Sequence, residues 1–341
     1  MFVKLSDSSK FLLSNENSLI DLSVGLFLFR YLSEIEINQS TFAFLNFICP
    51  TLVLLSLFLT FILIVFSCKN QKSEEKKEAE LEGVIERKST KSANVSILEK
   101  EFIVENLNNI SHKVWVYLPP DYNSSTENYP VIYMHDAQNL FDDKTSFVGE
   151  WEIDESLNKL YKESGKGFIA VGVENGGEKR IEEYTPWKHK KYGGGKGEIY
   201  VIFLAETLKP YIDKNYRTKP ERENTAIVGS SLGGLISFYA GLQYSDVFGK
   251  VGALSTSFWF SDKINSFTKE KGDLKNTKIY FLVGEKEGEE MVEGTKKTVK
   301  LLSEIGFPKE NMVTKIVVNG EHNEALWKRE FLNTITFLYN L

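Results

Sequence analysis

Apolar and polar residues alternate along residues 97–341 in two distinct patterns. Short apolar runs of strand length are separated by longer segments in which apolar residues recur at helical spacing. The strand-like runs lie at residues 97–105, 113–118, 131–134, 168–173, 226–228, 250–254, 278–283 and 313–318. The helix-like segments lie at residues 152–161, 199–212, 232–243, 288–305 and 324–339. This alternation predicts an α/β fold: a mostly parallel sheet with helices on both faces and the first two strands as an antiparallel edge.

The first 96 residues have a different character. No charged residue occurs between Glu36 and Lys69, and most of that interval is apolar. Residues 51–67, extended by residues 42–48, are long enough to cross a bilayer as a helix. We therefore divide the chain into an N-terminal extension (1–40), a hydrophobic signal or anchor segment that contacts the membrane (41–68), a charged tether (69–96) and a globular domain (97–341).

The hydrophobic segment ends in the sequence Val65-Phe-Ser-Cys68. An apolar run that ends in a small residue and a cysteine is similar to the lipobox of bacterial lipoproteins, whose cysteine becomes the lipidated N-terminus. Phe66 fits that pattern poorly, and no basic residue lies between Arg30 and Lys69 to begin such a signal. We expect Cys68 to be lipidated and the domain to face out of the cytoplasm. An uncleaved single-pass transmembrane anchor is the alternative, and the lysines after it would favour a cytoplasmic domain.

The overall charge and the cysteines limit the classes of partner. With 41 Lys and Arg against 47 Asp and Glu, the formal net charge is -6 at pH 7, which argues against nucleic acid as the main partner. The two cysteines, Cys49 and Cys68, both precede the globular domain. A disulfide framework and a thiolate zinc site are therefore excluded from that domain.

A candidate nucleophile lies in the sequence Gly229-Ser-Ser-Leu-Gly233, between an apolar run and a helix-like segment. This is the G-x-S-x-G pattern in the strand–turn–helix context of a nucleophile elbow. The glycines permit a tight, strained turn that exposes the serine hydroxyl. Ser231 is therefore the candidate nucleophile.

His322 is the candidate base for Ser231. It is the one histidine of the four that follows Ser231, and in the fold that carries this elbow the order along the chain is Ser, acid, His. The acid belongs on the loop after residues 278–284. That loop offers Glu285, Glu287, Glu289 and Glu290. We select Glu287, and a Ser–His dyad without an acid remains an open alternative.

An oxyanion hole needs two backbone N–H donors. Leu232, directly after the candidate nucleophile, supplies the first at the start of a helix. The second is expected from the loop after the strand-like run at residues 131–134, where Ala137 is our candidate and Gln138 the next choice. This second assignment rests on analogy with the fold.

Several separate blocks of the globular domain resemble one family. They are Tyr133-Met-His-Asp-Ala-Gln-Asn-Leu-Phe141, Glu182-Glu-Tyr-Thr-Pro-Trp187, Gly229-Ser-Ser-Leu-Gly-Gly234, Leu254-Ser-Thr-Ser-Phe-Trp259, and Gly320-Glu-His322 with Trp327. Together they resemble the putative esterase family of α/β-hydrolases, which includes esterase D, feruloyl esterases and enterochelin-type siderophore esterases. The resemblance implies hydrolysis of a small-molecule ester through an acyl-serine at Ser231 with His322 as base, without a metal or organic cofactor. Siderophore-type members manage with a dyad, so the acid stays open.

Two kinds of residue suit a substrate pocket. Trp151, Trp187 and Trp259 each lie near the end of an expected strand, where their rings could hold an aromatic acyl group; packing in the core is the alternative. Arg180 could bind an anionic substrate or pair with Glu182 or Glu183. The sequence thus predicts a serine esterase, with siderophore-like or aromatic esters as the candidate substrates. A serine peptidase or acyltransferase on the same fold, or an inactive ligand-binding domain, remains as an alternative.

Overall fold

The computed structural model describes residues 87–107, 109–272 and 276–341. The predicted membrane segment at residues 41–68, with Cys68, and the first part of the tether lie outside the described residues. Within the described ranges, no helix has both the length and the apolar character needed to cross a membrane.

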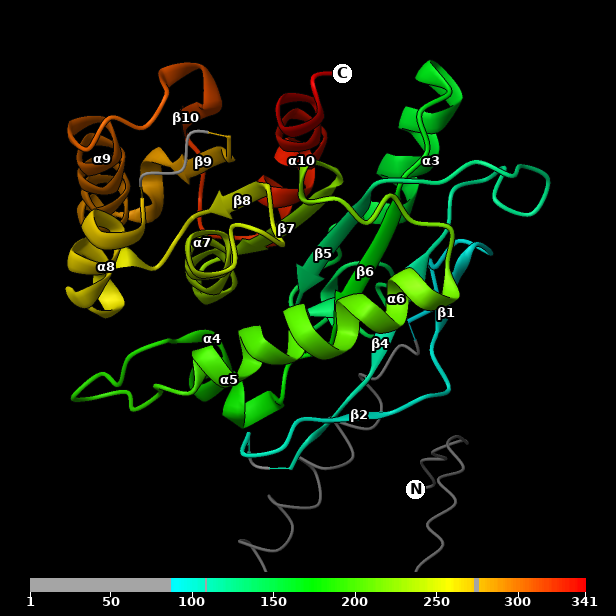
Figure 1. Ribbon diagram of the computed structural model, residues 1–341, viewed down its shortest axis with the longest axis horizontal. Coiled ribbons are helices and arrows are strands. Elements are labelled where there is room, and N and C mark those ends of the chain that lie inside the picture. Colours follow the sequence, from blue (N-terminus) through cyan, green and yellow to red (C-terminus); the bar gives the residue numbers. More distant parts are fainter. Residues whose placement is uncertain (1–86, 108, 273–275) are drawn as a thin grey trace, which may run out of the picture. The chain divides into compact units, whose positions relative to one another are not determined.

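An eight-stranded sheet forms the centre of the described domain (Figure 1). Its strands, in spatial order, are β1 (Val95–Ile97), β4 (Val114–Tyr117), β6 (Ile169–Val173), β5 (Val131–His135), β7 (Thr225–Ser230), β8 (Lys250–Leu254), β9 (Lys278–Gly284) and β10 (Met312–Val317). β4 runs antiparallel to both of its neighbours, and every pair from β6 to β10 is parallel. This confirms the predicted α/β fold with a mostly parallel sheet.

The register of the parallel strands aligns their carboxyl ends. Ser230 at the end of β7 pairs with Leu254 at the end of β8, and Leu254 also pairs with Leu282 of β9. Gly284 at the end of β9 pairs with Val317 at the end of β10. The loops that follow these strands therefore start at one edge of the sheet, which is where a site forms in open α/β folds.

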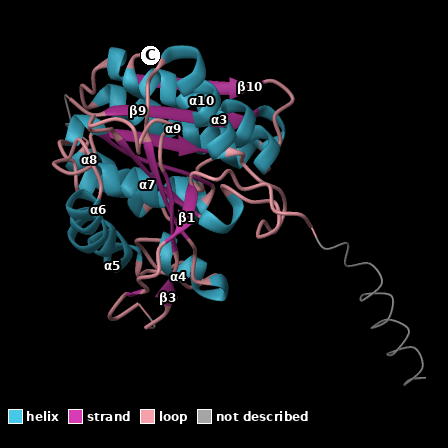
Figure 2. Cartoon of the chain, turned by 90° about the vertical axis from the view of Figure 1, so that its right-hand side faces the viewer, coloured by secondary structure: helices cyan, strands magenta, loops and turns pink. Residues whose placement is uncertain are grey.

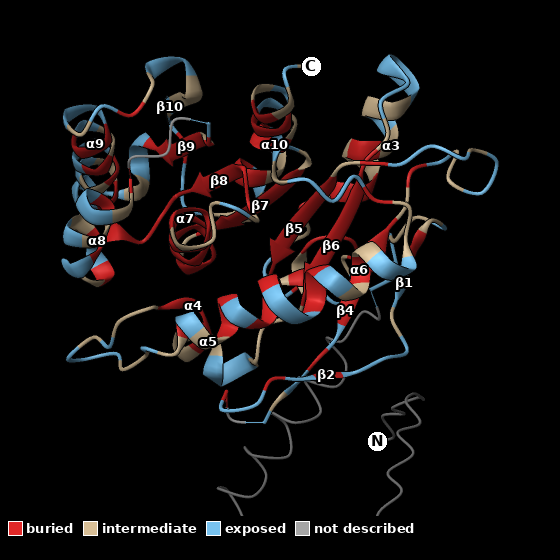
Figure 3. Ribbon diagram, viewed as in Figure 1, coloured by how far each residue is buried: buried red, intermediate tan, exposed pale blue. Residues whose placement is uncertain are grey.

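Helices cover both faces of the sheet, as its buried strands require (Figures 2 and 3). One face packs against α3 (Ile153–Ser164) and α10 (Glu324–Tyr339). The other face packs against α4 (Arg180–Tyr184), α5 (Gly197–Ile202), the π-helical segment η3 (Phe203–Leu208), α6 (Lys209–Asn215), α7 (Leu232–Gln243), α8 (Lys263–Lys271) and α9 (Glu289–Glu304). Along β5, Ile132 and Met134 belong to the first core, and Val131 and Tyr133 belong to the second.

The predicted strand at residues 97–105 is wrong in its extent. β1 ends at Ile97, and Phe102–Ile103 forms a separate strand, β2, which pairs with β3 (Ser111–His112) in a small two-stranded sheet. The charged sequence Glu99-Lys-Glu101 separates the two strands. Three consecutive charged residues cannot alternate between a buried and an exposed face, so the strand is interrupted there. The short helices α4 and α8 were not predicted.

The packed domain also begins earlier than residue 97. The backbone N–H of Thr90 donates to Asp142 Oδ1 at 3.1 Å, and the N–H of Ser92 donates to Asp154 Oδ2 at 2.8 Å. Asp154 is fully buried. Residues 87–96, which the sequence assigned to the tether, therefore lie on the domain because buried carboxylates accept their polar groups.

Candidate active site

Ser231 occupies a sharp turn between β7 and α7. Its backbone has φ 58° and ψ -122°, a region that residues with a side chain rarely adopt. Gly229 of the pattern and Gly234, the residue after it, must be glycines for steric reasons, whereas Gly233 has room for a Cβ 3.5 Å from its nearest neighbour. A Cβ on Gly229 would lie 2.5 Å from the carbonyl oxygen of Gly233, and one on Gly234 would lie 2.8 Å from that of Leu254. The G-x-S-x-G sequence therefore forms the strained elbow that the pattern predicts.

The loop after β8 holds the elbow in place. Ser231 N–H donates to Leu254 O at 3.0 Å, and Ser257 N–H donates to Ser231 O at 3.1 Å. The hydroxyl groups of Ser231 and Ser257 lie 3.3 Å apart. The nucleophile candidate is thus fixed by backbone hydrogen bonds on two sides, with its hydroxyl beside a second hydroxyl.

His322 lies on the loop between β10 and α10 and bonds to Glu287 in the 3-10 turn η6 (Glu285–Glu287). Nδ1 of His322 lies 2.8 Å from Oε2 of Glu287. The Glu287 side chain is fully buried, whereas that of His322 is 37% exposed. Because a carboxylate can only accept, this hydrogen bond requires a proton on Nδ1, and in the neutral ring the lone pair is then on Nε2. The structure thus singles out Glu287 from the four glutamates of this loop.

The other carboxylate oxygen of Glu287, Oε1, also has hydrogen-bond partners. Oε1 accepts from Gly284 N–H at 2.6 Å and from the Ser255 hydroxyl at 2.6 Å. The Ser255 oxygen in turn accepts from Nε1 of Trp327 at 2.8 Å. The Trp327 ring stands edge-on to the His322 ring at 5.1 Å between centroids. A buried network of satisfied hydrogen bonds therefore fixes the carboxylate and, through it, the imidazole.

Ser231 and His322 line one cavity of about 670 Å³. Its apolar lining comes from Phe147, Val148, Trp151 and Trp327, and its polar lining includes Asp136, Gln138, Asn175, Arg180 and Glu324. A cavity of this size with convergent polar groups has the form of a small-molecule site.

Arg180 lines the cavity, but its charge is already paired. Its Nε and one terminal nitrogen donate to the two oxygens of Asp136 at 2.7 and 2.9 Å, and Asn175 donates to Asp136 at 2.5 Å. Burial raises the pKa of Asp136, but the charge and hydrogen bonds of Arg180 together with the hydrogen bond from Asn175 hold that pKa below its usual range. The partner of Arg180 is therefore Asp136, and neither Glu182 nor Glu183 as the sequence suggested. Glu183 bonds to His112 instead.

His135, at the end of β5, is a buried structural histidine. Its two ring nitrogens lie 3.0 Å from the Tyr200 hydroxyl and 3.0 Å from the Ser237 hydroxyl. Burial lowers the pKa of His135 to about 4. The ring is therefore neutral at physiological pH and ties β5 to α5 and α7.

The three candidate tryptophans have different environments. Trp151 lines the cavity and packs on Trp327 with ring centroids 5.5 Å apart. Trp187 packs instead against Tyr239 and Phe267 on the helical layer. Trp259 is 38% exposed and makes edge-on ring contacts with His189 and Tyr192. The structure brings Trp151 to the cavity that contains Ser231 and leaves Trp187 and Trp259 in other clusters.

The expected oxyanion-hole residues flank the elbow. Leu232 is the first residue of α7, and Asp136 turns the chain with φ 59° and ψ 45° into the 3-10 turn η1 (Ala137–Asn139). Ala137 is 1% exposed, and Gln138 lines the cavity. The choice between the backbone N–H groups of Ala137 and Gln138 therefore stays a prediction.

Sequence reasoning gave no role to Ser255, Ser257, Trp327 or Asn175. Ser255 and Ser257 belong to a block after β8, and that position at the carboxyl end of a strand was the available signal. Phe147 and Val148 carried no signal, because an isolated apolar pair in a loop has no periodicity.

The order of strands, the elbow after β7 and the histidine after β10 define an α/β-hydrolase. The chain belongs to the putative esterase family, whose model matches residues 106–338. It is 27% identical over 237 residues to the uncharacterized protein YbbA of Bacillus subtilis, covering 66% of this chain and 91% of that protein. It is 28% identical over 223 residues to an endo-1,4-beta-xylanase/feruloyl esterase of Xylanibacter ruminicola, covering 63% of this chain and 27% of that protein.

Solved structures share the fold. The BES protein from Bacillus cereus superposes with a TM-score of 0.59 at 19% identity, covering 75% of this chain and 98% of that one. The enterobactin esterase FES from Shigella flexneri superposes with a TM-score of 0.57 at 15% identity, covering 74% of this chain and 61% of that one. Membership of the esterase family supports carboxylic ester hydrolysis as the general activity.

Proposed function

We propose that the protein is a serine carboxylesterase in which Ser231 is the nucleophile, His322 the base and Glu287 the acid. The observation that carries the proposal is the His322–Glu287 hydrogen bond of 2.8 Å, formed beside the strained Ser231 in one cavity. A serine hydroxyl is a poor nucleophile without a base, and the lone pair on Nε2 of His322 is the available one. The Ser231 hydroxyl has to turn from Ser257 toward that nitrogen as substrate binds.

The reaction proceeds in two halves. Ser231 Oγ forms a bond to the ester carbonyl carbon while its proton passes to Nε2 of His322, and the alcohol leaves with that proton. Water then attacks the acyl-serine, gives its proton to His322, and the acid is released as Ser231 recovers its hydrogen. The N–H of Leu232, with the N–H of Ala137 or Gln138, stabilises the negative oxygen in both halves.

The substrate is proposed to be an aromatic ester, of the hydroxycinnamoyl or catecholate type. The indole rings of Trp151 and Trp327 form part of the cavity wall, and Phe147 extends it. The polar groups of Asn175 and Glu324 can bind ring hydroxyls. A feruloyl esterase and an enterobactin esterase are among the similar proteins, which agrees with this substrate class.

A membrane-tethered form of the enzyme is also proposed. Its support is the sequence alone: an uncharged run that ends at Cys68 and a polar tether after it. Lipidation of Cys68 would hold the esterase domain at the outer side of a membrane, and an uncleaved anchor is the alternative. Mass spectrometry of the membrane-extracted protein distinguishes them, since an N-terminus at Met1 with unmodified Cys68 contradicts the lipoprotein form.

Labelling with a fluorophosphonate tests the nucleophile. The wild type and Ser230→Ala should each carry one phosphonate on Ser231, and Ser231→Ala should carry none and lose hydrolysis of p-nitrophenyl esters. A label on another residue, or full activity of Ser231→Ala, contradicts the proposal. A panel of methyl butyrate, methyl ferulate and a catecholate siderophore tests the substrate class, because the two methyl esters share a leaving group. Preference for methyl butyrate over both aromatic substrates contradicts it.

A further inference from the structure

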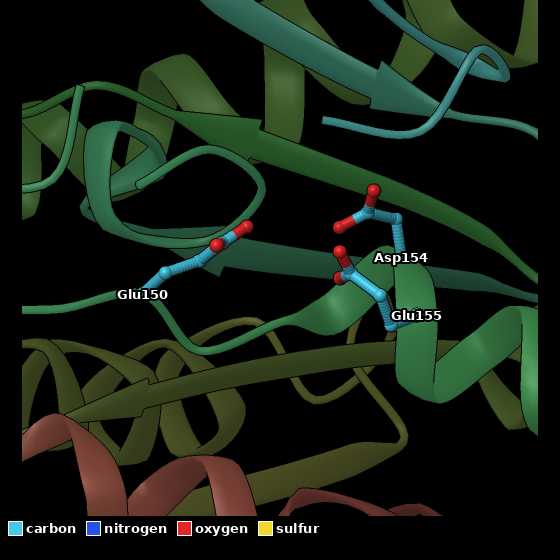
Figure 4. A group of neighbouring side chains, drawn as sticks. All are labelled: Glu150, Asp154 and Glu155. Atoms are coloured by element: carbon cyan, nitrogen blue, oxygen red, sulfur yellow. The ribbon is translucent and has the colours of Figure 1, made fainter. Parts of the chain in front are cut away.

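Three carboxylates gather at the start of α3, outside the cavity that contains Ser231. Glu150 lies on the loop before the helix, and Asp154 and Glu155 lie on its first turn (Figure 4). One oxygen from each residue lies within 4.8 Å of the other two. The Glu150 side chain points from its loop toward the two carboxylates of the helix (Figure 4).

One oxygen of each carboxylate is shielded from solvent and has no hydrogen-bond partner: Oε1 of Glu150, Oδ1 of Asp154 and Oε2 of Glu155. Asp154 as a whole is 0% exposed. The opposite oxygens of two of these residues accept from neutral donors, the Thr90 hydroxyl at 2.7 Å and the Ser92 N–H at 2.8 Å. An unpaired buried carboxylate oxygen is costly, and three of the seven unpaired buried side-chain atoms of the described residues gather at this point.

We propose that Glu150, Asp154 and Glu155 bind one divalent cation through oxygen, and that the site fits Ca²⁺ best. Carboxylate oxygens are hard ligands, which favours Ca²⁺, Mg²⁺ or Mn²⁺ over zinc or copper.

Ca²⁺ takes carboxylate oxygens at about 2.3–2.6 Å in flexible geometry, whereas Mg²⁺ requires a near-ideal octahedron at about 2.0–2.1 Å. Three carboxylate oxygens that lie within 4.8 Å of one another, from a loop and a helix turn, suit the ion with the less strict geometry.

The position of the site gives the ion a structural role. It joins the segment that contains Thr90 and Ser92, which leads to the N-terminal part of the chain, to the start of α3. Trp151, the residue after Glu150, forms part of the cavity wall and packs on Trp327. The bound ion thus fixes the N-terminal segment and one wall of the cavity together, and takes no part in the chemistry at Ser231.

Titration of the EDTA-treated full-length protein tests the site. CaCl₂ should bind with a stoichiometry of one per chain in calorimetry and raise the melting temperature by several degrees. Tb³⁺, a luminescent substitute for Ca²⁺, should be sensitised by the adjacent Trp151 ring, and Ca²⁺ should displace it. Mg²⁺ should give a smaller shift at equal concentration.

Isosteric variants identify the ligands. Asp154→Asn and the double variant Glu150→Gln/Glu155→Gln should lose the stoichiometric binding and the Tb³⁺ signal, with both folds checked by circular dichroism. Glu152→Gln is the matched control, because Glu152 lies between the ligands but pairs with Lys328 on the surface, and it should bind as the wild type does. The proposal is overturned if no divalent cation binds the wild type. It is also overturned if binding persists in the ligand variants, or if the double variant is simply more stable than the wild type at every Ca²⁺ concentration, as a proton-sharing cluster would predict.

Discussion

Replacing Glu287 by glutamine gives the sharpest test of the proposed catalytic network. Oε1 of Glu287 accepts two hydrogen bonds, one of them from the backbone N–H of Gly284, which cannot reverse its polarity. A glutamine must therefore keep its oxygen there and turn its NH₂ group toward Nδ1 of His322. Two N–H groups cannot face each other, so Nδ1 has to accept and the imidazole proton moves to Nε2. The base then carries a proton on the nitrogen that should take one from Ser231.

The expected loss follows from that tautomer. The same change of carboxylate to amide in a serine protease triad lowers kcat about 10⁴-fold with the geometry intact. This corresponds to about 5.4 kcal/mol of lost transition-state stabilisation at about 1.36 kcal/mol per factor of ten. Because Gln fills the volume of Glu, the fold should be retained and the loss should appear in kcat more than in KM.

The assay is the steady-state hydrolysis of p-nitrophenyl butyrate, with the active enzyme counted by fluorophosphonate titration. Glu285→Gln is the matched control: it lies two residues away in the same turn, and its carboxylate accepts from the N–H of Asn319 at 3.1 Å without contact to the histidine. It should stay within about threefold of the wild type, as surface charges do. A loss below about tenfold for Glu287→Gln would refute the reasoning in favour of a Ser–His dyad. An equal loss for Glu285→Gln would refute the assignment of the acid.

Three further predictions concern the scaffold. Gly234→Ala places a Cβ 2.7 Å from Thr256 Oγ1 and should lower the free energy of unfolding by about 1–3 kcal/mol in urea titrations. Gly294→Ala leaves 3.4 Å between the new Cβ and Phe258 Cβ, and should raise the free energy of unfolding by up to about 1 kcal/mol. Trp327→Phe removes the donor to Ser255 and part of the buried indole ring, and should cost about 1–3 kcal/mol in the same assay; no loss would show that neither the hydrogen bond nor this packing contributes to stability. The pKa of His135 is about 6.5 in the unfolded chain and about 4 in the native fold. Between these pH values the unfolded chain binds a proton that the native protein does not bind. The free energy of unfolding should therefore fall by about 3 kcal/mol as the pH drops through this range. His135→Gln should flatten this part of the pH profile, and an unchanged slope would contradict the assignment.

Elements with strong periodicity were predicted from the sequence with their ends. The strand at residues 250–254 and the helix at residues 324–339 coincide with β8 and α10. Both bury one continuous apolar pattern in the core, so their local sequence carries the information. The short helix α4 buries Glu183 and Tyr184 through contacts with distant residues, and no local pattern reveals that.

The candidate site was predictable to the extent that it follows chain order. The elbow pattern located Ser231, and the position after the last strand located His322, because the fold places both loops at one sheet edge. Chain order does not predict which neighbours the ring of a loop residue packs against. For this reason Trp187 and Trp259 were expected at the cavity, although their rings pack elsewhere. The docking of residues 87–96 was missed for a related reason: its contacts are backbone and hydroxyl groups bound to Asp142 and Asp154, more than fifty positions away.

The turn after β8 has a consequence for changing the specificity of this protein. The N–H of Ser257 donates to the backbone of Ser231, and the hydroxyl of Ser255 donates to the carboxylate of Glu287. One short loop therefore positions both the proposed nucleophile and the proposed acid. Random mutagenesis of that loop should mostly yield inactive clones. Phe147 and Val148 line the same cavity but are 84% and 60% exposed, so side chains of other sizes can be accommodated there at little cost in stability. A library for new ester substrates is therefore best built at residues 147 and 148, with residues 255–257 kept constant.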